Sequence, residues 1–243
     1  MFVFFVQNHK NTLYKSGFLC YNNRKTDDKQ KESDFMSKKL IITIARQYGS
    51  GGREIGEKVA AALDIPLYDK EIIKDAAAQG DLHVDVIQKS EETAANSLLY
   101  TLAMGSNVFG ASMAFGYKMP LNDKLFILQS DIIKNYAKEG SCVIIGRCGD
   151  YVLRDESNLL RIFVFGDLDH RKERVLARHP DVKESQVIDI INKTDKRRAS
   201  YYNFYTGQKW GQFGNYDLTV NSSTLGIDGV VNAIVDLAKK KME

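Results

Sequence analysis

The sequence predicts an α/β protein whose parallel sheet is flanked by helices. Three short and largely apolar runs, at 40–45, 141–148 and 161–166, are typical of strands buried on both faces of such a sheet. Segments with apolar residues at helical spacing separate these runs, which favours βαβ units with right-handed crossovers. A glycine-rich turn directly follows the first run. In sheets of this kind ligands bind beyond the carboxyl ends of the strands, so we expect the functional residues at that edge.

The other elements follow in a regular order. The glycine turn leads into a helix over 54–63, which Asp64 and Pro66 end. A helix over 122–138 carries apolar residues at helical spacing, and Gly140 closes it. The remaining predicted elements are a brief strand at 66–69, a helix at 70–78 that stops at Gly80, a basic helix at 169–178, a short strand at 215–221 and a C-terminal helix at 228–241.

Composition limits the classes of protein that fit. A chain of 243 residues can form one substantial core, with 44% hydrophobic and 27% charged residues. The formal charge of +3 is too small to indicate a nucleic-acid partner. Three cysteines, Cys20, Cys142 and Cys148, lack paired spacing, which argues against a disulfide framework or a zinc knuckle. We therefore expect a reducing, cytoplasmic setting.

Two segments lack clear periodicity. Residues 1–35 open with a short apolar stretch that is too short for a signal-peptide core or a membrane span, so we expect neither export nor a membrane partner. We expect 1–35 to be a disordered leader or a start-site extension, and 36–243 to be a single domain that begins at Met36. Residues 81–120 mix small, aromatic and sulfur-bearing side chains. We interpret them as a helical insertion on the substrate side.

The glycine turn has the character of a phosphate-binding loop. Its glycines let successive N–H groups point into one concavity, and the following helix adds the positive end of its dipole. Against the orthodox motif G-x-x-x-x-G-K-[ST], Arg46 stands at the first glycine, Gly52 at the lysine and Arg53 at the hydroxyl residue. A plain strand-to-helix turn is the alternative, but three glycines between two arginines favour phosphate. The candidate nucleotide-binding residues are Arg46, Gly49, Ser50, Gly51, Gly52, Arg53 and Glu54.

Arginines recur beside the expected ligand edge. Arg147 comes just after the strand that ends at Gly146, and further arginines share one face of the basic helix or lie about one helix later. A solvated basic face is the alternative interpretation. Phosphoryl transfer nevertheless needs cations, because negative charge spreads over the transferred oxygens. The candidate catalytic residues are Arg53, Arg147, Arg171, Arg174, Arg197 and Arg198.

Residues 195–211 are dense in both cations and aromatic side chains. Such a segment can bind single-stranded nucleic acid through charge and stacking. It can also form a lid that closes over a nucleotide and excludes water. A third possibility is that most of the aromatic rings only pack under a loop. We favour a lid, at about 179–210.

Four motifs together resemble the cytidylate kinase-like family: ITIARQYGSGGREIG at 42–56, YDKEII at 68–73, VIIGR at 143–147 and DKRRASYY at 195–202. The resemblance covers about residues 39–240. It implies a P-loop nucleoside-monophosphate-kinase fold with a helical acceptor-binding insertion and an arginine-bearing lid. It also implies ATP with Mg²⁺ as donor, and small-molecule nucleotides rather than nucleic acid as partners. The implied acceptor is a pyrimidine monophosphate, CMP or dCMP.

The resemblance also assigns residues. It places the phosphate loop at 49–53, the acceptor edge at Gly146 and Arg147, and an aspartate that opens the acceptor-binding helix at Asp69. In the family, the loop position of Glu54 carries a hydroxyl residue, and that of Cys148 an aspartate. Arg46 or Arg53 could supply the charge of the absent loop lysine, although arginine is larger and planar. Magnesium could be held by Asp69, or by water and phosphate alone.

Three other functions stay open at the level of sequence. The same fold could act on a different small phosphorylated or hydroxyl acceptor. The absent lysine also fits a nucleotide-binding sensor without turnover. A nucleic-acid-binding module is the third, and it would show a steep salt dependence of binding.

Overall fold

The computed structural model of the protein describes residues 39–80 and 120–242. These belong to one unit, Lys39–Glu243. The expected leader at 1–35 and nearly all of the expected insertion at 81–120 lie outside the described residues. None of the helices in the described part of the chain combines the length and the apolar character needed to cross a membrane.

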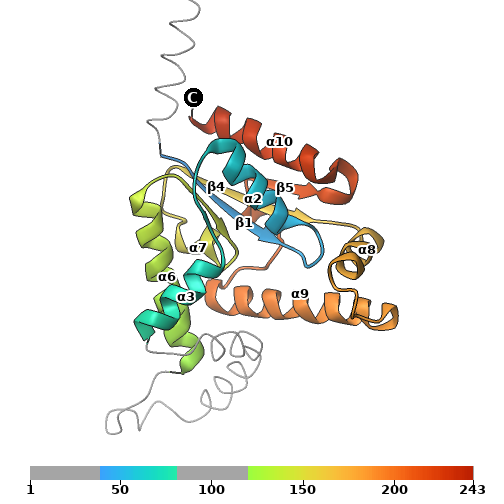
Figure 1. Cartoon of the computed structure of the whole chain (residues 1–243). Coiled ribbons are helices and arrows are strands. Elements are labelled where there is room, and N and C mark those ends of the chain that lie inside the picture. The colour runs from blue at the N-terminus through green and yellow to red at the C-terminus, as the bar shows by residue number, and fades with distance from the viewer. Residues whose placement is uncertain (1–38, 81–119, 243) are drawn as a thin grey trace, which may run out of the picture. The chain divides into compact units, whose positions relative to one another are not determined.

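Five parallel strands form one sheet at the centre of this unit (Figure 1). Their order across the sheet is β2-β3-β1-β4-β5. Ile42 of the central strand pairs with Val143 on one side and with Leu160 on the other. The strands are β1 (Ile41–Arg46), β2 (Leu67–Tyr68), β3 (Cys142–Ile145), β4 (Leu159–Phe165) and β5 (Leu218–Asn221). The parallel α/β class predicted from the sequence is confirmed.

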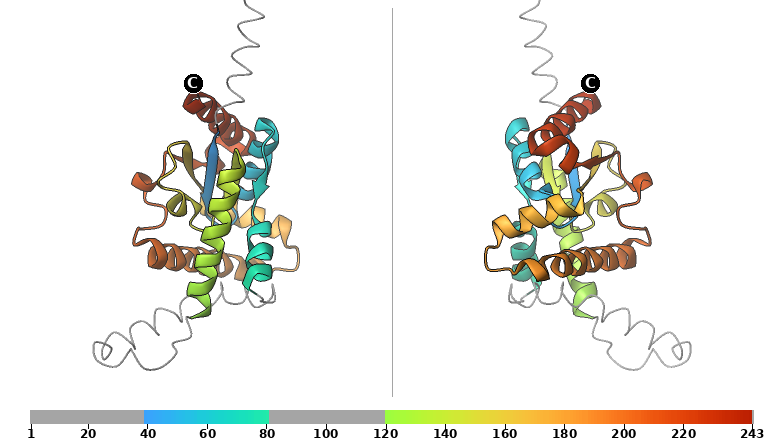
Figure 2. Two further views of the ribbon diagram at one scale, coloured as in Figure 1. Left: turned by 90° about the vertical axis from the view of Figure 1, so that its left-hand side faces the viewer. Right: turned by 90° about the vertical axis from the view of Figure 1, so that its right-hand side faces the viewer.

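Helices connect the strands and cover the sheet. They are α2 (Gly52–Leu63), α3 (Lys70–Gly80), α6 (Leu121–Glu139), the short α7 (Gly149–Val152), α8 (Leu168–Arg178), α9 (Glu184–Thr206) and α10 (Ser222–Met242), with a 3₁₀ turn at Phe213–Asn215. In Figures 1 and 2, α10 lies beside α2, and α3 lies beside α6.

The alternation of side chains along the strands assigns these helices to opposite faces. A Cβ placed at Gly56 of α2 would contact Ile44 and Ile145. The core cluster that contains residues of α3, α6 and α7 instead includes Ile41 and Ile144. Since successive strand residues point to opposite faces, α2 packs on one face and this cluster on the other. Burial on both faces explains why the strands consist almost entirely of apolar residues.

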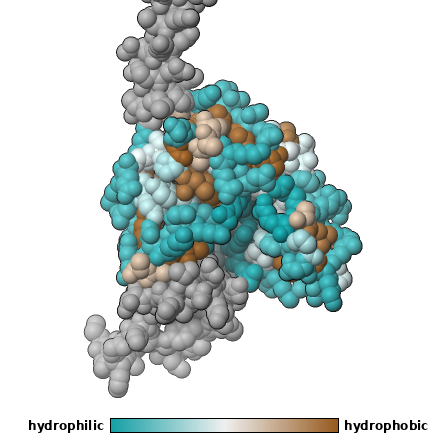
Figure 3. Space-filling view, viewed as in Figure 1, coloured by the Kyte–Doolittle hydropathy of each residue, from teal (hydrophilic) through white to brown (hydrophobic). Residues whose placement is uncertain are grey.

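The face seen in Figure 3 is mostly hydrophilic, with hydrophobic residues in small patches. Ile132 and Ile133 of α6 and Val230 of α10 are instead buried in the core. The apolar stripes found in the sequence therefore mark the helix faces that pack inward.

Several boundaries differ from the sequence prediction. The C-terminal helix begins at Ser222 rather than Asp228, and non-helical Gly226, with φ 66°, interrupts it. The first strand extends to Arg46, one residue beyond the predicted end. The segment at 195–211 begins inside α9, a helix of 23 residues. Whether 179–210 acts as a lid stays a prediction.

Candidate active site

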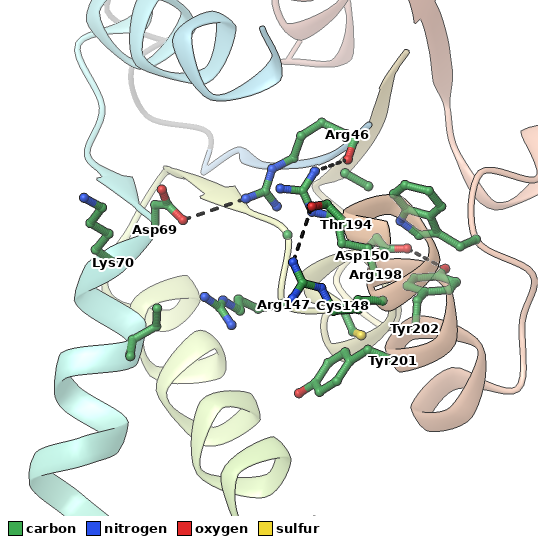
Figure 4. Close-up of a pocket in the computed structure, with 15 residues that line it drawn as sticks. Arg46, Asp69, Lys70, Arg147, Cys148, Asp150, Thr194, Arg198, Tyr201 and Tyr202 are labelled. Atoms are coloured by element: carbon green, nitrogen blue, oxygen red, sulfur yellow. Dashed lines mark hydrogen bonds and ion pairs between the residues drawn. The ribbon is translucent and has the colours of Figure 1, made fainter. Parts of the chain in front are cut away.

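A cavity of about 440 Å³ opens at the carboxyl edge of the sheet (Figure 4). Arg46 approaches it from the end of β1 and Arg147 from the loop after β3, while Tyr201 and Tyr202 line it from α9. This is the edge at which parallel α/β sheets bind ligands. The expected position of the site follows from the strand order, because β1 and β3 are neighbours and end side by side.

Positive charge dominates the cavity wall. Among the described residues that line it, two carboxylates, Asp69 and Asp150, accompany five cationic side chains: Arg46, Lys70, Arg147, Arg197 and Arg198. Cations removed from water are stabilised by a bound anion, since desolvation otherwise disfavours their charged form. An excess of arginines, most of them partly buried, is therefore an arrangement suited to phosphate groups, which arginine can bind through two parallel hydrogen bonds.

Burial affects the ionisation of three of these arginines. Desolvation, with a contribution from Arg198, lowers the pKa of Arg46 to about 9. Desolvation also lowers the pKa of Arg147 and of Arg198. A guanidinium with a pKa of about 9 is still protonated at neutral pH. The side chain of Arg46 therefore carries its charge in the cavity wall.

Asp69 links the cavity to the glycine loop. It follows β2 directly and is 7% exposed. Its Oδ2 lies 3.3 Å from Nε of Arg53, and its Oδ1 lies 4.0 Å from a guanidinium nitrogen of Arg46. One carboxylate therefore contacts the two arginines that flank the loop, one at each end.

The loop itself has the backbone that a phosphate site requires. Gly49 and Gly51 have φ angles of 81° and 79°, a region that glycine adopts without strain. A Cβ at Gly49 would lie 2.8 Å from the carbonyl oxygen of Arg171, so no larger residue fits there. Gly51 directly precedes α2, and no side chain caps that end of the helix. Its first N–H groups and its dipole are thus available to an anion.

Two other predicted arginines contact the loop but do not line the cavity. Arg171 is 4% exposed, and its guanidinium donates to Oδ2 of Asp195 over 2.8 Å. Arg174 donates to Oε2 of Glu54 over 2.6 Å. Arg174 therefore packs against the start of α2 through an ion pair, whereas Arg171 pairs with α9 and lies beside Gly49 of the loop. Their catalytic role stays a prediction, whereas Arg46, Arg147, Arg197 and Arg198 do meet in the cavity.

Sequence reasoning missed one carboxylate of the cavity. Asp150 is 6% exposed, and its Oδ2 accepts a hydrogen bond from the Tyr202 hydroxyl at 2.7 Å. Burial raises the pKa of Asp150, and the hydrogen bond from Tyr202 opposes that rise. The only signal in the sequence was its place three residues after Arg147, within reach of the same strand end. Tyr202 itself was noted only as one of several aromatic residues.

The backbone after β3 is strained. Arg147 and Cys148 have φ angles of 56° and 53°, in the left-handed region. Non-glycine residues adopt this conformation at a cost of about 1–2 kcal/mol each. Strain of this kind persists where the surrounding structure determines it, often at functional sites. Here it directs Arg147 and Cys148 into the cavity wall.

The residues of the site fit one part of a magnesium nucleotide well. The glycine loop and the arginines are suited to bind its phosphate groups. No group of three or more His, Cys, Asp and Glu side chains is set to hold a metal within 39–80 and 120–242. Asp69 is the carboxylate placed between the loop and the cavity, and Glu54 is bonded to Arg174. Magnesium in nucleotide sites keeps several waters and needs only one or two carboxylates, so Asp69 with water and phosphate oxygens would suffice.

The parallel sheet, the glycine loop between β1 and α2, and the arginine-lined cavity at the carboxyl edge define a P-loop kinase with the nucleoside-monophosphate-kinase fold. The chain belongs to the cytidylate kinase-like family, whose model matches residues 41–224. The family expected from the four sequence motifs is therefore confirmed. No curated protein matches the chain.

A solved structure agrees with this fold. An uncharacterized protein from Eubacterium ventriosum is 27% identical, with a TM-score of 0.60, over 82% of this chain and 98% of that one. A shikimate kinase from Bacteroides thetaiotaomicron is 13% identical, with a TM-score of 0.48, over 82% of this chain and 98% of its own. The second likeness is too distant to bear on the substrate.

Proposed function

We propose that this protein transfers the γ-phosphoryl group of ATP to a nucleoside monophosphate, CMP or dCMP. The observation that carries the proposal is the cluster of arginines beside a glycine loop, with few carboxylates to neutralise them. A nucleotide donor and a nucleotide acceptor would each bring phosphate charge to this place. The choice of cytosine rests on the family, whose description names cytidylate.

Different residues would bind the donor nucleotide and the acceptor nucleotide. The loop at 49–53 would bind the donor phosphates through backbone N–H groups. Arg147 and Arg198, which line the cavity, would hold and align the acceptor phosphate. An acceptor phosphate is already an anionic nucleophile, so no catalytic base is required, and the arginines mainly screen charge. Magnesium, when bound, would supply further charge on the transferred oxygens, with Asp69 as its carboxylate.

One observation favours a second candidate function, a nucleotide-binding sensor without turnover. Glu54 stands where the family carries a hydroxyl residue, and it is bonded to Arg174 at 2.6 Å. A guanidinium nitrogen of Arg178 also lies near this carboxylate, 3.7 Å from the same Oε2 atom. A sensor would bind ATP in the loop and transfer nothing.

The test is ADP release by the full chain with Mg²⁺ and ATP, offered CMP, dCMP, UMP, AMP and GMP in turn. We expect turnover with CMP or dCMP. Arg147→Ala should lower kcat/KM by about 100- to 1000-fold, since it removes one charge-stabilising donor. Arg154→Ala is the matched control, because Arg154 lies outside the cavity and its side chain is 49% exposed. ATP binding with no ADP release across the panel would reject a nucleoside-monophosphate acceptor and favour either the sensor or a different small acceptor.

The cellular compartment of the protein is also part of the proposal. Cys142 and Cys148 are free and buried thiols. Free thiols are typical of proteins in reducing compartments. We expect the protein to work in the cytoplasm, with small-molecule nucleotides and not nucleic acid as its partners.

A further inference from the structure

Arg46 and Gly52 have exchanged the residue types of the orthodox phosphate loop. The orthodox motif has glycine at the first position and lysine at the seventh. Here the cation stands first and the glycine seventh. In space the two positions are adjacent: a Cβ on Gly52 would lie 2.5 Å from Cβ of Arg46 and 2.9 Å from its Cγ. The side chain of Arg46 therefore fills the space in which a side chain at position 52 would begin.

The charged end of Arg46 lies between the loop and the cavity. It passes over Gly146, where an added Cβ would overlap the guanidinium. It lines the cavity, and its side chain is only 20% exposed. Among the described residues, the carboxylate in an ion pair with it is that of Asp69, which is 4.0 Å away and closer to Arg53. Its positive charge is thus weakly compensated and directed at the place where donor and acceptor phosphates would meet.

Arg53 is the competing source of charge, but its surroundings argue against that role. Its side chain is 42% exposed. Its Nε lies 3.1 Å from Glu57 and 3.3 Å from Asp69. Two carboxylates therefore already neutralise Arg53, and water screens it.

We infer that Arg46 supplies the phosphate-binding charge that a lysine supplies in the orthodox loop, and that position 52 is glycine because the Arg46 side chain occupies its space. The inference rests on the proposed function, since it concerns the same nucleotide phosphates. A planar guanidinium has two donor edges where an ammonium is a point charge. Arg46 can therefore bridge the terminal donor phosphate and the acceptor phosphate.

The test restores the residue types of the orthodox loop at positions 46 and 52. The full chain and four variants, Arg46→Gly, Arg46→Lys, Gly52→Lys and the double variant R46G/G52K, are titrated with a non-hydrolysable ATP analogue and with inorganic tripolyphosphate by calorimetry. Arg46→Gly should weaken both affinities by about 10- to 100-fold, the loss of a charged hydrogen bond. Gly52→Lys alone should also weaken binding, because its side chain overlaps Arg46. The double variant should recover to within about tenfold of the parent chain.

Controls separate this inference from folding effects and from the proposed function. Circular dichroism confirms folding, and Arg46→Lys, which keeps the charge, should lie between the parent and Arg46→Gly. Arg53→Ala should weaken binding by less than about fivefold, the range of an exposed ion pair. Arg46→Gly binding as the parent does, or a double variant no better than Arg46→Gly, would overturn the inference. Intact ATP binding with no transfer to any nucleotide would overturn only the proposed function.

Discussion

At the scale of single residues, Asp150 is an ionisable group buried at a wall of cations and tyrosines. Its carboxylate is held by the Tyr202 hydroxyl, which also lies 2.9 Å from Oε1 of Gln208. Burial raises the pKa of Asp150 in the folded chain above its ordinary value. Between the two pKa values the folded state binds more protons than the unfolded state, so this residue makes stability fall as pH rises.

The change Asp150→Asn tests that effect. The amide keeps an acceptor for Tyr202 but cannot ionise. Across an interval that begins below the ordinary carboxyl pKa and ends above the raised pKa of Asp150, the side chain at position 150 stays neutral in the variant, whereas the parent acquires the buried charge. We expect the free energy of unfolding of the variant, minus that of the parent, to rise over this interval in urea titrations. Tyr202→Phe is the paired variant: it removes the donor that opposes the pKa rise, so its stability should fall more steeply with pH. A difference independent of pH would contradict this account.

At the scale of elements, α9 holds the glycine loop in place through several contacts. Oδ1 of Asp195 accepts from the Tyr48 N–H at 2.7 Å, and its Oδ2 accepts from Arg171. Arg198 donates to the carbonyl of Arg46 over 2.9 Å and lies over the Tyr48 ring. If 179–210 moves as a lid, these contacts must break. The position of α9 is therefore coupled to the loop.

Asp195 is the group in α9 whose loss should matter most. Asp195→Ala leaves the guanidinium of Arg171, 5% exposed, without its carboxylate partner. Removing one partner of a buried ion pair costs about 3–5 kcal/mol, so we expect a loss of that order in the free energy of unfolding by urea. Asp189→Ala on the same helix is the control, because its ion pair with Lys193 is exposed at 62% and 71%. The control should change stability by less than about 1 kcal/mol. Equal effects of the two changes would show that the loop contact is not stabilising.

At the scale of the whole molecule, the cation-lined cavity should couple anion binding to stability. A ligand that binds only the folded state at 100 times its Kd adds about 2.7 kcal/mol. For a chain of this length that corresponds to a rise in Tm of about 5–10 °C. We expect CMP and inorganic tripolyphosphate to raise Tm in thermal unfolding of the full chain. Cytidine, which lacks the phosphate, is the control. A shift by cytidine equal to that by CMP would mean that the arginines do not bind the phosphate.

The whole-molecule architecture was largely predictable from sequence. Strands buried on both faces must be apolar, so β1, β3 and β4 appear as apolar runs. The loop was predictable because Gly49 and Gly51 adopt φ angles that other residues avoid. The helical turn that begins at Ser222 was not predicted, because non-helical Gly226 separates it from the helix predicted at 228–241. The expected leader and most of the insertion lie outside the described residues.

The amino-acid sequence alone predicts the class of fold, the place of the loop and the sign of the charge around it, because these depend on local periodicity and on neighbouring residues. Which arginines face the cavity depends instead on tertiary packing. Arg174 contacts Glu54 across 120 residues of sequence, and Tyr48 contacts Asp195 across 147. Such pairings arise when helices pack on a sheet, and no local pattern records them. The conformation of the loop between β1 and α2 brings Arg46 against Gly52, which is the contact on which the proposed pairing of these two residues rests.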